Sequence, residues 1–182
     1  LIYYQKSGGG ITLSGGEPLQ QKDFALDILQ KCREHRIHTA VETNLLTDIN
    51  TLEAFLPWVD LWMCDFKMAD DTLHRKWTGH SNVPIIKNLE FLAKQAVPMT
   101  IRTPVIPNVN DSEEAIESIC RFIRQLPNQP AYELLGFHSL GFVKFENLGM
   151  KNPLSNSAFL KKGQLQKLNE ILIRYNLNNN KK

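Results

Sequence analysis

The sequence predicts an α/β fold in which about five parallel strands alternate with helices. Short apolar stretches alternate with longer segments whose apolar residues recur every three or four positions. No linker, repeat or low-complexity tract interrupts the 182 residues, so we expect a single domain over residues 1–182. Strands that alternate with helices indicate a parallel sheet with right-handed crossovers. The pattern fits either an open doubly wound sheet or part of a (β/α) barrel.

Three strands are expected in the first part of the chain, at residues 11–13, 39–41 and 60–65. A helix over residues 20–35 joins the first two strands, and its apolar residues have the spacing of one helical face. We expect that buried face to consist of Phe24, Ala25, Ile28, Leu29 and Cys32. A weaker helix is predicted over residues 50–58.

Two helices are expected before the fourth strand, a short one at residues 72–77 and a longer one at 83–96. The inward residues of the longer helix are expected to be Ile85, Leu89, Leu92 and Ala96. The fourth strand is predicted at residues 99–105, where Pro107 ends it.

A capping-box-like D-x-x-E spacing at residues 111–114 predicts the start of the next helix. That helix is expected to pack through Ile116, Ile119, Cys120 and Ile123. The fifth strand is predicted at residues 133–135, followed by a long loop over 136–156. One face of the last helix is expected to carry Leu165, Leu168, Leu172 and Tyr175.

Composition excludes several classes of protein. The chain is 42% hydrophobic and 22% charged with a net charge of +2, as in ordinary soluble domains. Lysine and arginine form no block, which argues against a nucleic-acid partner. No apolar run reaches the length of a membrane span. Three widely spaced cysteines do not suggest disulfides, so a reducing cytoplasm is the expected location.

Polar or glycine residues follow the apolar body of every predicted strand. The five endings are Ser14-Gly15-Gly16-Glu17, Glu42-Thr43-Asn44, Asp65-Phe66-Lys67, Arg102-Thr103 and Gly136-Phe137-His138. In parallel α/β folds the carboxyl ends of the strands share one face, and ligands bind there. Carboxylates, a lysine, an arginine and a histidine at one rim therefore predict a ligand site.

Each of these residues also has a simpler structural interpretation. Glu17 could place a charge at a helix N-terminus, and Glu42 could cap a neighbouring helix. Asp65 and Lys67, two residues apart on one face of a strand end, could form a plain ion pair. His138 could be an ordinary loop histidine.

The glycines indicate two different features. Gly15 and Gly16 let the backbone approach a ligand or adopt positive φ. Their surroundings match neither the dinucleotide-binding G-x-G-x-x-G spacing nor a P-loop. The run at residues 8–10 is typical of a turn that leads into the first strand.

Five segments together resemble the pyruvate formate-lyase activating enzyme family of the radical-SAM superfamily. They are GGGITLSGGEP at 8–18, VETN at 41–44, LWMCDFK at 61–67, IRTPVIP at 101–107 and FHSLGFVKFENLG at 137–149. GGEP alone occurs in many radical-SAM proteins, whereas its combination with HSLG-x-x-KF is far more specific. The resemblance implies a partial (β/α) barrel of the radical-SAM type.

The resemblance also implies roles for the residues at the rim. The turn Ser14, Gly15, Gly16 and Glu17 would hold the methionine amino group of S-adenosylmethionine. Asp65 and Lys67 would contact the methionine moiety. Further positions near this cofactor would be Thr43, Asn44, Arg102 and His138. Glu42, Asp65 and the Met63 carbonyl would form a monovalent-cation site, with Glu42 where the family often has aspartate.

By the same resemblance, the complete enzyme would use a [4Fe–4S] cluster to cleave S-adenosylmethionine reductively. The resulting 5′-deoxyadenosyl radical would take hydrogen from a glycine of a partner such as pyruvate formate-lyase. A flavodoxin- or ferredoxin-type protein would supply the electron. The family's C-x-x-x-C-x-x-C cluster motif is absent here, because Cys32, Cys64 and Cys120 are isolated and are expected in the core.

We therefore expect this chain to be a fragment that is inactive by itself. The cluster loop would precede Leu1, and a final strand would follow Asn178. Three alternatives stay open from the residues: another radical-SAM enzyme acting on a small molecule or tRNA, a non-radical barrel lyase or aldolase, and a non-catalytic module that pairs through a sheet edge. The aldolase would use Lys67 for a Schiff base and Asp65 as acid or base.

Overall fold

Five parallel strands form one sheet, and their order in the sheet is their order in the sequence. The computed structural model describes residues 4, 9–139, 142–152, 154–155 and 159–177. The strands are β1 (Gly10–Leu13), β2 (His38–Thr43), β3 (Leu61–Asp65), β4 (Met99–Val105) and β5 (Ala131–Gly136). Each pairs in parallel with the next. A doubly wound sheet reverses the direction in which strands are added. The sequential order therefore identifies part of a (β/α) barrel.

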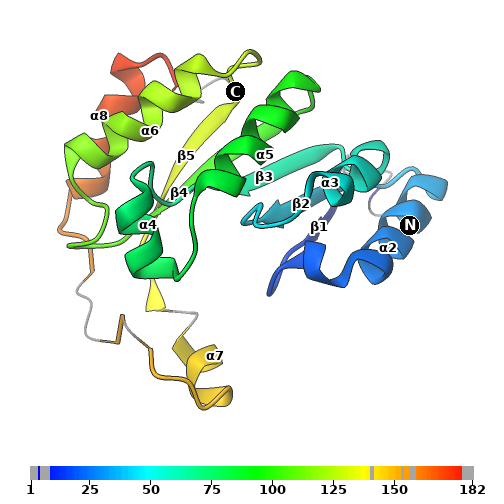
Figure 1. Cartoon of the computed structure of the whole chain (residues 1–182), viewed down its shortest axis with the longest axis horizontal. Coiled ribbons are helices and arrows are strands. Elements are labelled where there is room, and N and C mark those ends of the chain that lie inside the picture. Colours follow the sequence, from blue (N-terminus) through cyan, green and yellow to red (C-terminus); the bar gives the residue numbers. More distant parts are fainter. Residues whose placement is uncertain (1–3, 5–8, 140–141, 153, 156–158, 178–182) are drawn as a thin grey trace.

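Sequential right-handed crossovers place the connecting helices on one face of the sheet. In Figure 1, α2, α3, α5, α6 and α8 lie along that face, whereas α7 stands apart beyond the end of β5. The helical elements are η1 (Pro18–Gln21), α2 (Lys22–Glu34), α3 (Ile49–Phe55), η2 (Leu56–Trp58), α4 (Asp71–Thr78), α5 (Val83–Lys94), α6 (Glu113–Gln125), α7 (Phe142–Asn147) and α8 (Gln164–Arg174).

Alternation along the central strands separates a core face from an open face. Successive residues of a strand point to opposite faces. Along β3, Trp62 and Cys64 are fully buried, whereas Met63 and Asp65 are only partly covered. Strand β4 shows the same alternation over seven residues. The helix-covered face thus holds the hydrophobic core, and the opposite face carries polar side chains toward the carboxyl ends of the strands.

The predicted helix faces are confirmed in part. All four predicted residues of α6 are buried: Ile116, Ile119, Cys120 and Ile123. In α2 the buried residues are Ala25, Leu29 and Cys32, but Phe24 is 64% exposed. The prediction of a buried Phe24 was wrong, because α2 covers the edge of the sheet and only a narrow stripe finds core to pack against.

Ala96 was also expected to point inward, and this was wrong. Helix α5 ends at Lys94, and Ala96 lies beyond it in a left-handed conformation with φ of 54°. Ala93, one turn earlier, takes the buried position. Helix periodicity gives the direction of a side chain only while the helix continues.

Two other local predictions need correction. The expected loop over residues 136–156 contains the short helix α7, although Leu140, Gly141, Pro153 and Asn156 lie outside the described residues.

Helix α6 is capped by Ser112, whose Oγ accepts a hydrogen bond from the Ala115 backbone N–H at 3.2 Å. Asp111 instead accepts from the backbone N–H of Asn108 at 3.0 Å. A serine one position nearer the helix took the role expected of the aspartate.

Gly10 begins strand β1 and pairs with His38, so it does not belong to a preceding turn as predicted. A Cβ atom at this position would collide with the His38 backbone. The close approach of β1 to β2 therefore requires glycine here. Gly8 lies outside the described residues.

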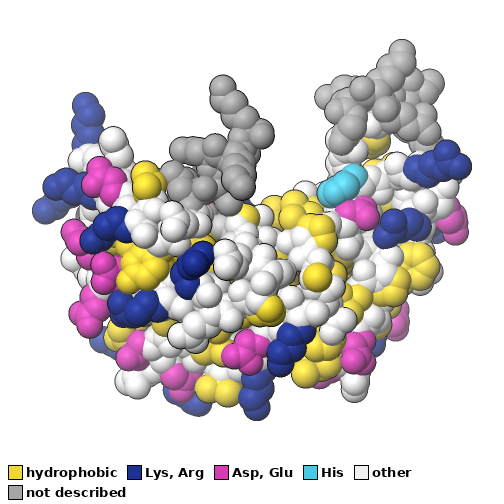
Figure 2. All heavy atoms as spheres, turned by 90° about the horizontal axis from the view of Figure 1, so that it is seen from above, with side chains coloured by type: hydrophobic (Ala, Val, Ile, Leu, Met, Phe, Trp, Pro, Cys, Tyr) yellow, Lys and Arg dark blue, Asp and Glu magenta, His cyan; other side chains and the backbone are white. Residues whose placement is uncertain are grey.

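The outer surface carries mixed charge. Figure 2 shows acidic and basic side chains interspersed over the face in view rather than gathered into one block. Within the part of the chain that the structure describes, no helix is long and apolar enough to cross a membrane.

The connection from α4 to α5 predicts a measurable pH dependence of stability. The Asp71 carboxylate accepts hydrogen bonds from Ser81 Oγ at 2.6 Å, Asn82 N at 2.8 Å and Arg75 Nε at 2.7 Å. These contacts, the Ser81 bond foremost, lower the pKa of Asp71 from 3.8 to about 2. A carboxyl group with a lowered folded-state pKa stabilises the fold above its unfolded-state pKa and loses this effect as the pH falls toward the folded-state value.

We therefore expect the stability difference between wild type and Asp71→Asn to shrink as the pH falls from 3.8 to about 2. Urea unfolding of both proteins at a series of pH values measures that difference. A difference that stays constant across this range would contradict the role given to Asp71.

Candidate functional site

A hollow of about 220 Å³ lies where β1, β2 and β3 end. The residues that line it are Ser14, Gly15, Gly16, Glu17, Glu42, Thr43, Asn44, Asp65 and Lys67. All of them belong to the first three polar strand endings identified in the sequence. Parallel pairing of β1 with β2 and of β2 with β3 brings these endings to one rim. The predicted gathering of side chains is confirmed for these three strands.

Glu17 ties the first strand ending to the second. Its Oε1 accepts hydrogen bonds from Thr43 Oγ1 at 2.7 Å and from the Leu19 backbone N–H at 3.2 Å. Its Oε2 accepts from the Asn44 backbone N–H at 2.8 Å. Glu17 thus also caps η1, as its simpler interpretation proposed. The carboxylate fixes the glycine turn against the end of β2.

Gly15 and Gly16 line the hollow without side chains. Gly15 has φ of 121°, a backbone conformation that only glycine adopts readily. A Cβ atom at either glycine would meet no other atom within 4 Å. The turn is therefore a cradle whose free space faces the hollow and could admit a ligand.

The third strand ending contributes an ion pair. Lys67 Nζ lies 2.8 Å from Asp65 Oδ2, and both side chains remain partly exposed to the hollow. The ion pair that the simpler interpretation of these two residues allowed is therefore present. A partly exposed pair of this kind contributes on the order of 1 kcal/mol to stability. A charged ligand in the hollow would therefore have to share or replace this pairing.

Arg102 lies beside Asp65 in the register of β3 and β4, on the open face of the sheet. Its Nη1 is 3.1 Å from Glu42 Oε1 and 3.9 Å from Met63 Sδ. Its Nε is 3.5 Å from Glu133 Oε2, close enough for an ion pair, but the geometry makes no hydrogen bond. Arg102 is not among the residues that line the hollow; it acts on the site through Glu42.

Glu133 is a site neighbour that the sequence reasoning missed. It pairs with Arg102 in the register of β4 and β5, and it is the one charged residue of the strand sequence AYELLG. A carboxylate in an otherwise uncharged strand was the available signal. Together with Glu17, Glu42 and Asp65 it gives four carboxylates against two cations, Lys67 and Arg102. The site is therefore negative and favours a ligand that carries positive charge.

His138 lies outside the hollow. It is an exposed residue after the end of β5, and β5 is separated from β3 by β4. The structure thus brings together nine of the predicted residues and places Arg102 next to them, but it does not bring His138 to the same cavity. A role of His138 in cofactor contact remains a prediction.

The carboxylates proposed for a monovalent cation already have partners. Glu42 Oε2 accepts a hydrogen bond from Ser14 Oγ at 2.9 Å, its Oε1 faces Arg102, and Asp65 holds Lys67. Among the described residues, no three His, Cys, Asp or Glu side chains are grouped to hold a metal ion. A cation site formed by Glu42, Asp65 and the Met63 carbonyl stays a prediction.

The three cysteines are core residues, as predicted. Cys32, Cys64 and Cys120 are free and buried. Burial raises the pKa of Cys32, raises that of Cys64 further, and raises that of Cys120 to about 12. Metal and cluster ligation requires thiolates. The three thiols lie on three different elements, α2, β3 and α6, and within the described part of the chain no three such ligands are grouped, so they do not fit a [4Fe–4S] cluster.

Fold and site together define a class: a partial (β/α) barrel with a charged ligand hollow at the carboxyl ends of its strands. The Radical SAM superfamily matches residues 2–122 of the chain. The pyruvate formate-lyase-activating enzyme of Clostridium pasteurianum is 34% identical over 170 residues, which cover 93% of this chain and 71% of that protein. The chain belongs to the radical-SAM superfamily and, within it, to the family of pyruvate formate-lyase-activating enzymes.

Two further relatives agree with this assignment. The isethionate sulfite-lyase activating enzyme of Oleidesulfovibrio alaskensis is 44% identical over 155 residues, which cover 84% of this chain and 50% of that protein. The crystal structure of a domain of a pyruvate-formate lyase-activating enzyme from Bacteroides vulgatus superposes with a TM-score of 0.78 at 31% identity. That superposition covers 93% of this chain and 96% of the domain. The chain spans about half the length of the first curated relatives.

Proposed function

We propose that this chain is the S-adenosylmethionine-binding part of an enzyme that activates a glycyl-radical enzyme. One observation carries the proposal: the three strand endings of β1, β2 and β3 line a single hollow with charged groups of both signs around a glycine cradle. S-adenosylmethionine carries a sulfonium, an ammonium and a carboxylate. Groups of both signs in one small hollow fit such a ligand.

The residues of the hollow would divide the binding as follows. The glycine cradle at Gly15 and Gly16 gives backbone room for the methionine part, and Glu17 holds that cradle in place. Lys67 would bind the carboxylate of the methionine part, and the turn Ser14 to Glu17 together with Asp65 would bind its ammonium group. The excess of carboxylates favours the sulfonium charge. When bound, S-adenosylmethionine would supply the radical chemistry of the superfamily; this chain would bind and orient it and exclude water.

The remaining components would lie in the complete enzyme. Because Cys32, Cys64 and Cys120 do not fit a cluster, the [4Fe–4S] ligands would come from other cysteines. The partner would be a glycyl-radical enzyme, with pyruvate formate-lyase as one example, and a flavodoxin- or ferredoxin-type protein would donate the electron. The cytoplasm would be the compartment that suits these reduced partners.

Isothermal titration calorimetry of the chain with S-adenosylmethionine tests the proposal. We expect saturable one-site binding and a loss of about tenfold or more in Lys67→Met, because a charge-assisted hydrogen bond contributes about 1.5–3 kcal/mol. Lys94→Met, an exposed lysine of α5 away from the hollow, is the matched control and should bind like wild type. Absence of binding to the wild-type chain, or equal loss in both variants, would refute the proposal.

Reductive cleavage should need the complete enzyme. With a chemical reductant, this chain alone is expected to release no methionine from S-adenosylmethionine. Methionine release above a protein-free control would contradict the proposal that this chain binds S-adenosylmethionine but cannot cleave it by itself. Borohydride trapping of Lys67 with a carbonyl substrate would instead support the lyase alternative.

A further inference from the structure

The segment after β3 has no regular secondary structure, yet four of its successive backbone carbonyls are bound by buried side chains. The segment consists of residues 66–69, and it carries Lys67 into the hollow. Thr103 Oγ1 donates to the Phe66 carbonyl at 2.6 Å. Backbone groups outside helices and strands need such partners when they are buried.

Two asparagines bind the next three carbonyls. Asn110 Nδ2 donates to the Lys67 carbonyl at 2.9 Å and to the Pro104 carbonyl at 2.9 Å. Asn82 Nδ2 donates to the Met68 carbonyl at 3.0 Å and to the Ala69 carbonyl at 2.8 Å. The donors come from β4, the β4–α6 connection and the residue before α5. Three separate elements therefore converge on one short segment.

These donors are almost completely removed from solvent. Thr103 is 0% exposed, Asn82 1% and Asn110 2%. Asn110 also accepts a hydrogen bond from the Ile106 backbone N–H at 2.7 Å, so its amide oxygen and nitrogen are both in use. Water cannot readily replace such a side chain, and each buried group left without a partner costs about 1–3 kcal/mol.

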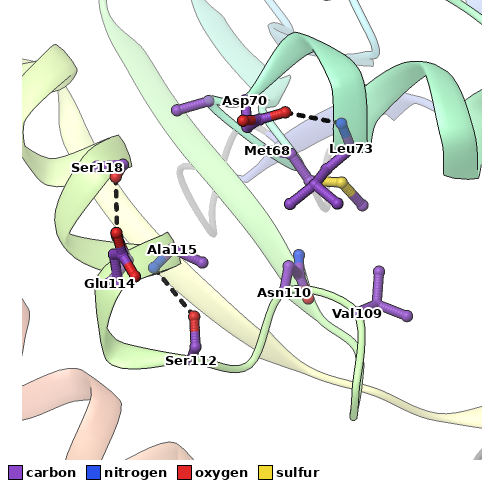
Figure 3. Close-up of a pocket in the computed structure, with 10 residues that line it drawn as sticks. Met68, Asp70, Leu73, Val109, Asn110, Ser112, Glu114, Ala115 and Ser118 are labelled. Carbon is purple, nitrogen blue, oxygen red and sulfur yellow. Dashed lines mark hydrogen bonds between the residues drawn. The ribbon is translucent and has the colours of Figure 1, made fainter.

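A second cavity borders one side of the segment. It has a volume of about 240 Å³, and Met68, Ala69 and Asn110 are among the residues that line it. Figure 3 shows Asn110 and Val109 side by side below Met68 and Leu73, with Ser112 and Glu114 of the α6 segment across from them. Phe66 is fully buried and packs against Phe122, so the carbonyl hydrogen bonds add to this packing in fixing the residues that border the cavity.

We propose that Asn110 is a positioning residue for the ligand site, which it serves by holding the Lys67 backbone so that the lysine side chain stays in the hollow. Thr103 and Asn82 hold the residues on either side. The inference rests on the proposed function, because its consequence is the recognition of the methionine part of S-adenosylmethionine. A supporting side chain of this kind acts through geometry, where small displacements have large effects.

Amide hydrogen exchange tests, without any ligand, whether Asn110 holds the segment at residues 66–69 in place. In Asn110→Ala, or in Asn110→Ser if the alanine variant does not fold, we expect faster exchange in the peptide that contains residues 66–69. The matched control is Thr39→Val, which removes the bond from a buried hydroxyl to the Trp58 carbonyl at 2.7 Å at the other end of the sheet. Unchanged exchange at 66–69 in the Asn110 variant, or the same increase in the control, would overturn the proposal.

A pair of ligands tests whether Asn110 contributes to recognition of the methionine part of S-adenosylmethionine. S-adenosylmethionine contains the methionine moiety, whereas 5′-methylthioadenosine lacks it. The Asn110 variant should bind S-adenosylmethionine about tenfold more weakly and 5′-methylthioadenosine within about twofold of wild type. Equal loss for both ligands, or no loss, would overturn the positioning role while leaving the proposed function intact. Failure of the wild-type chain to bind S-adenosylmethionine would instead overturn the proposed function and this inference with it.

Discussion

Glu17→Ala is expected to lower the free energy of unfolding by about 2–3 kcal/mol and to abolish measurable S-adenosylmethionine binding. The carboxylate accepts hydrogen bonds from Leu19 N, Thr43 Oγ1 and Asn44 N. In the alanine variant these three donors lose their charged acceptor and can bond only to water. Hydrogen bonds to a charged group are stronger than neutral ones, so their loss costs more. In a domain of this size the loss corresponds to a fall in Tm of about 5–10 °C.

Thermal unfolding and calorimetry measure both effects. Glu17→Gln should lie between the alanine variant and wild type, because one side-chain oxygen can still accept. Glu90→Ala, which removes an exposed carboxylate of α5, is the matched control and should change stability by about 0.5 kcal/mol or less. An alanine variant at position 17 as stable as this control would show that the three contacts do not hold the cradle.

A pair of glycine substitutions should separate folding from binding. Gly10→Ala is expected to lower the free energy of unfolding by about 1–3 kcal/mol, since its Cβ atom would collide with the His38 backbone and push β1 away from β2. Gly16→Ala should leave stability within about 1 kcal/mol of wild type, because its Cβ atom would meet nothing within 4 Å. Gly16 lines the hollow, so a methyl group there should still weaken S-adenosylmethionine binding.

Urea unfolding and ligand titration of the two variants provide the readout. The expected pattern is a stability loss confined largely to Gly10→Ala and a binding loss in both, because displacement of β1 also moves the cradle. A stable Gly10→Ala protein would contradict the close pairing of β1 with β2. Normal ligand affinity in Gly16→Ala would show that the ligand does not occupy the cradle.

The predictions that the structure confirms are those based on residues close together in the sequence. The strands fall within a few residues of their predicted places, and the buried face of α6 was predicted in full. The predicted strand endings supply every residue that lines the hollow. Ends of helices were predicted less well, as Phe24 and Ala96 show, because they depend on what a helix packs against and where it stops.

Sequence periodicity did not distinguish a doubly wound sheet from a (β/α) barrel. Both contain the same succession of strands and helices, and they differ in which strands become neighbours. The pairing of each strand with the next decides the question, since it puts the helices on one face and the polar residues on the other. Strand order is a property of long-range packing and is not encoded in the local pattern.

By itself, then, the sequence determined the strands and the longer helices, the parallel direction of the strands and the side chains at their ends, because these follow from periodicity and chain connectivity. Only the tertiary structure joined Arg102 to Glu42 and Glu133, left His138 outside the hollow and set Asn110 against the Lys67 carbonyl. Such contacts join residues far apart in the chain. They depend on the register between strands and on the depth at which each side chain is buried, and both are fixed when the whole domain packs.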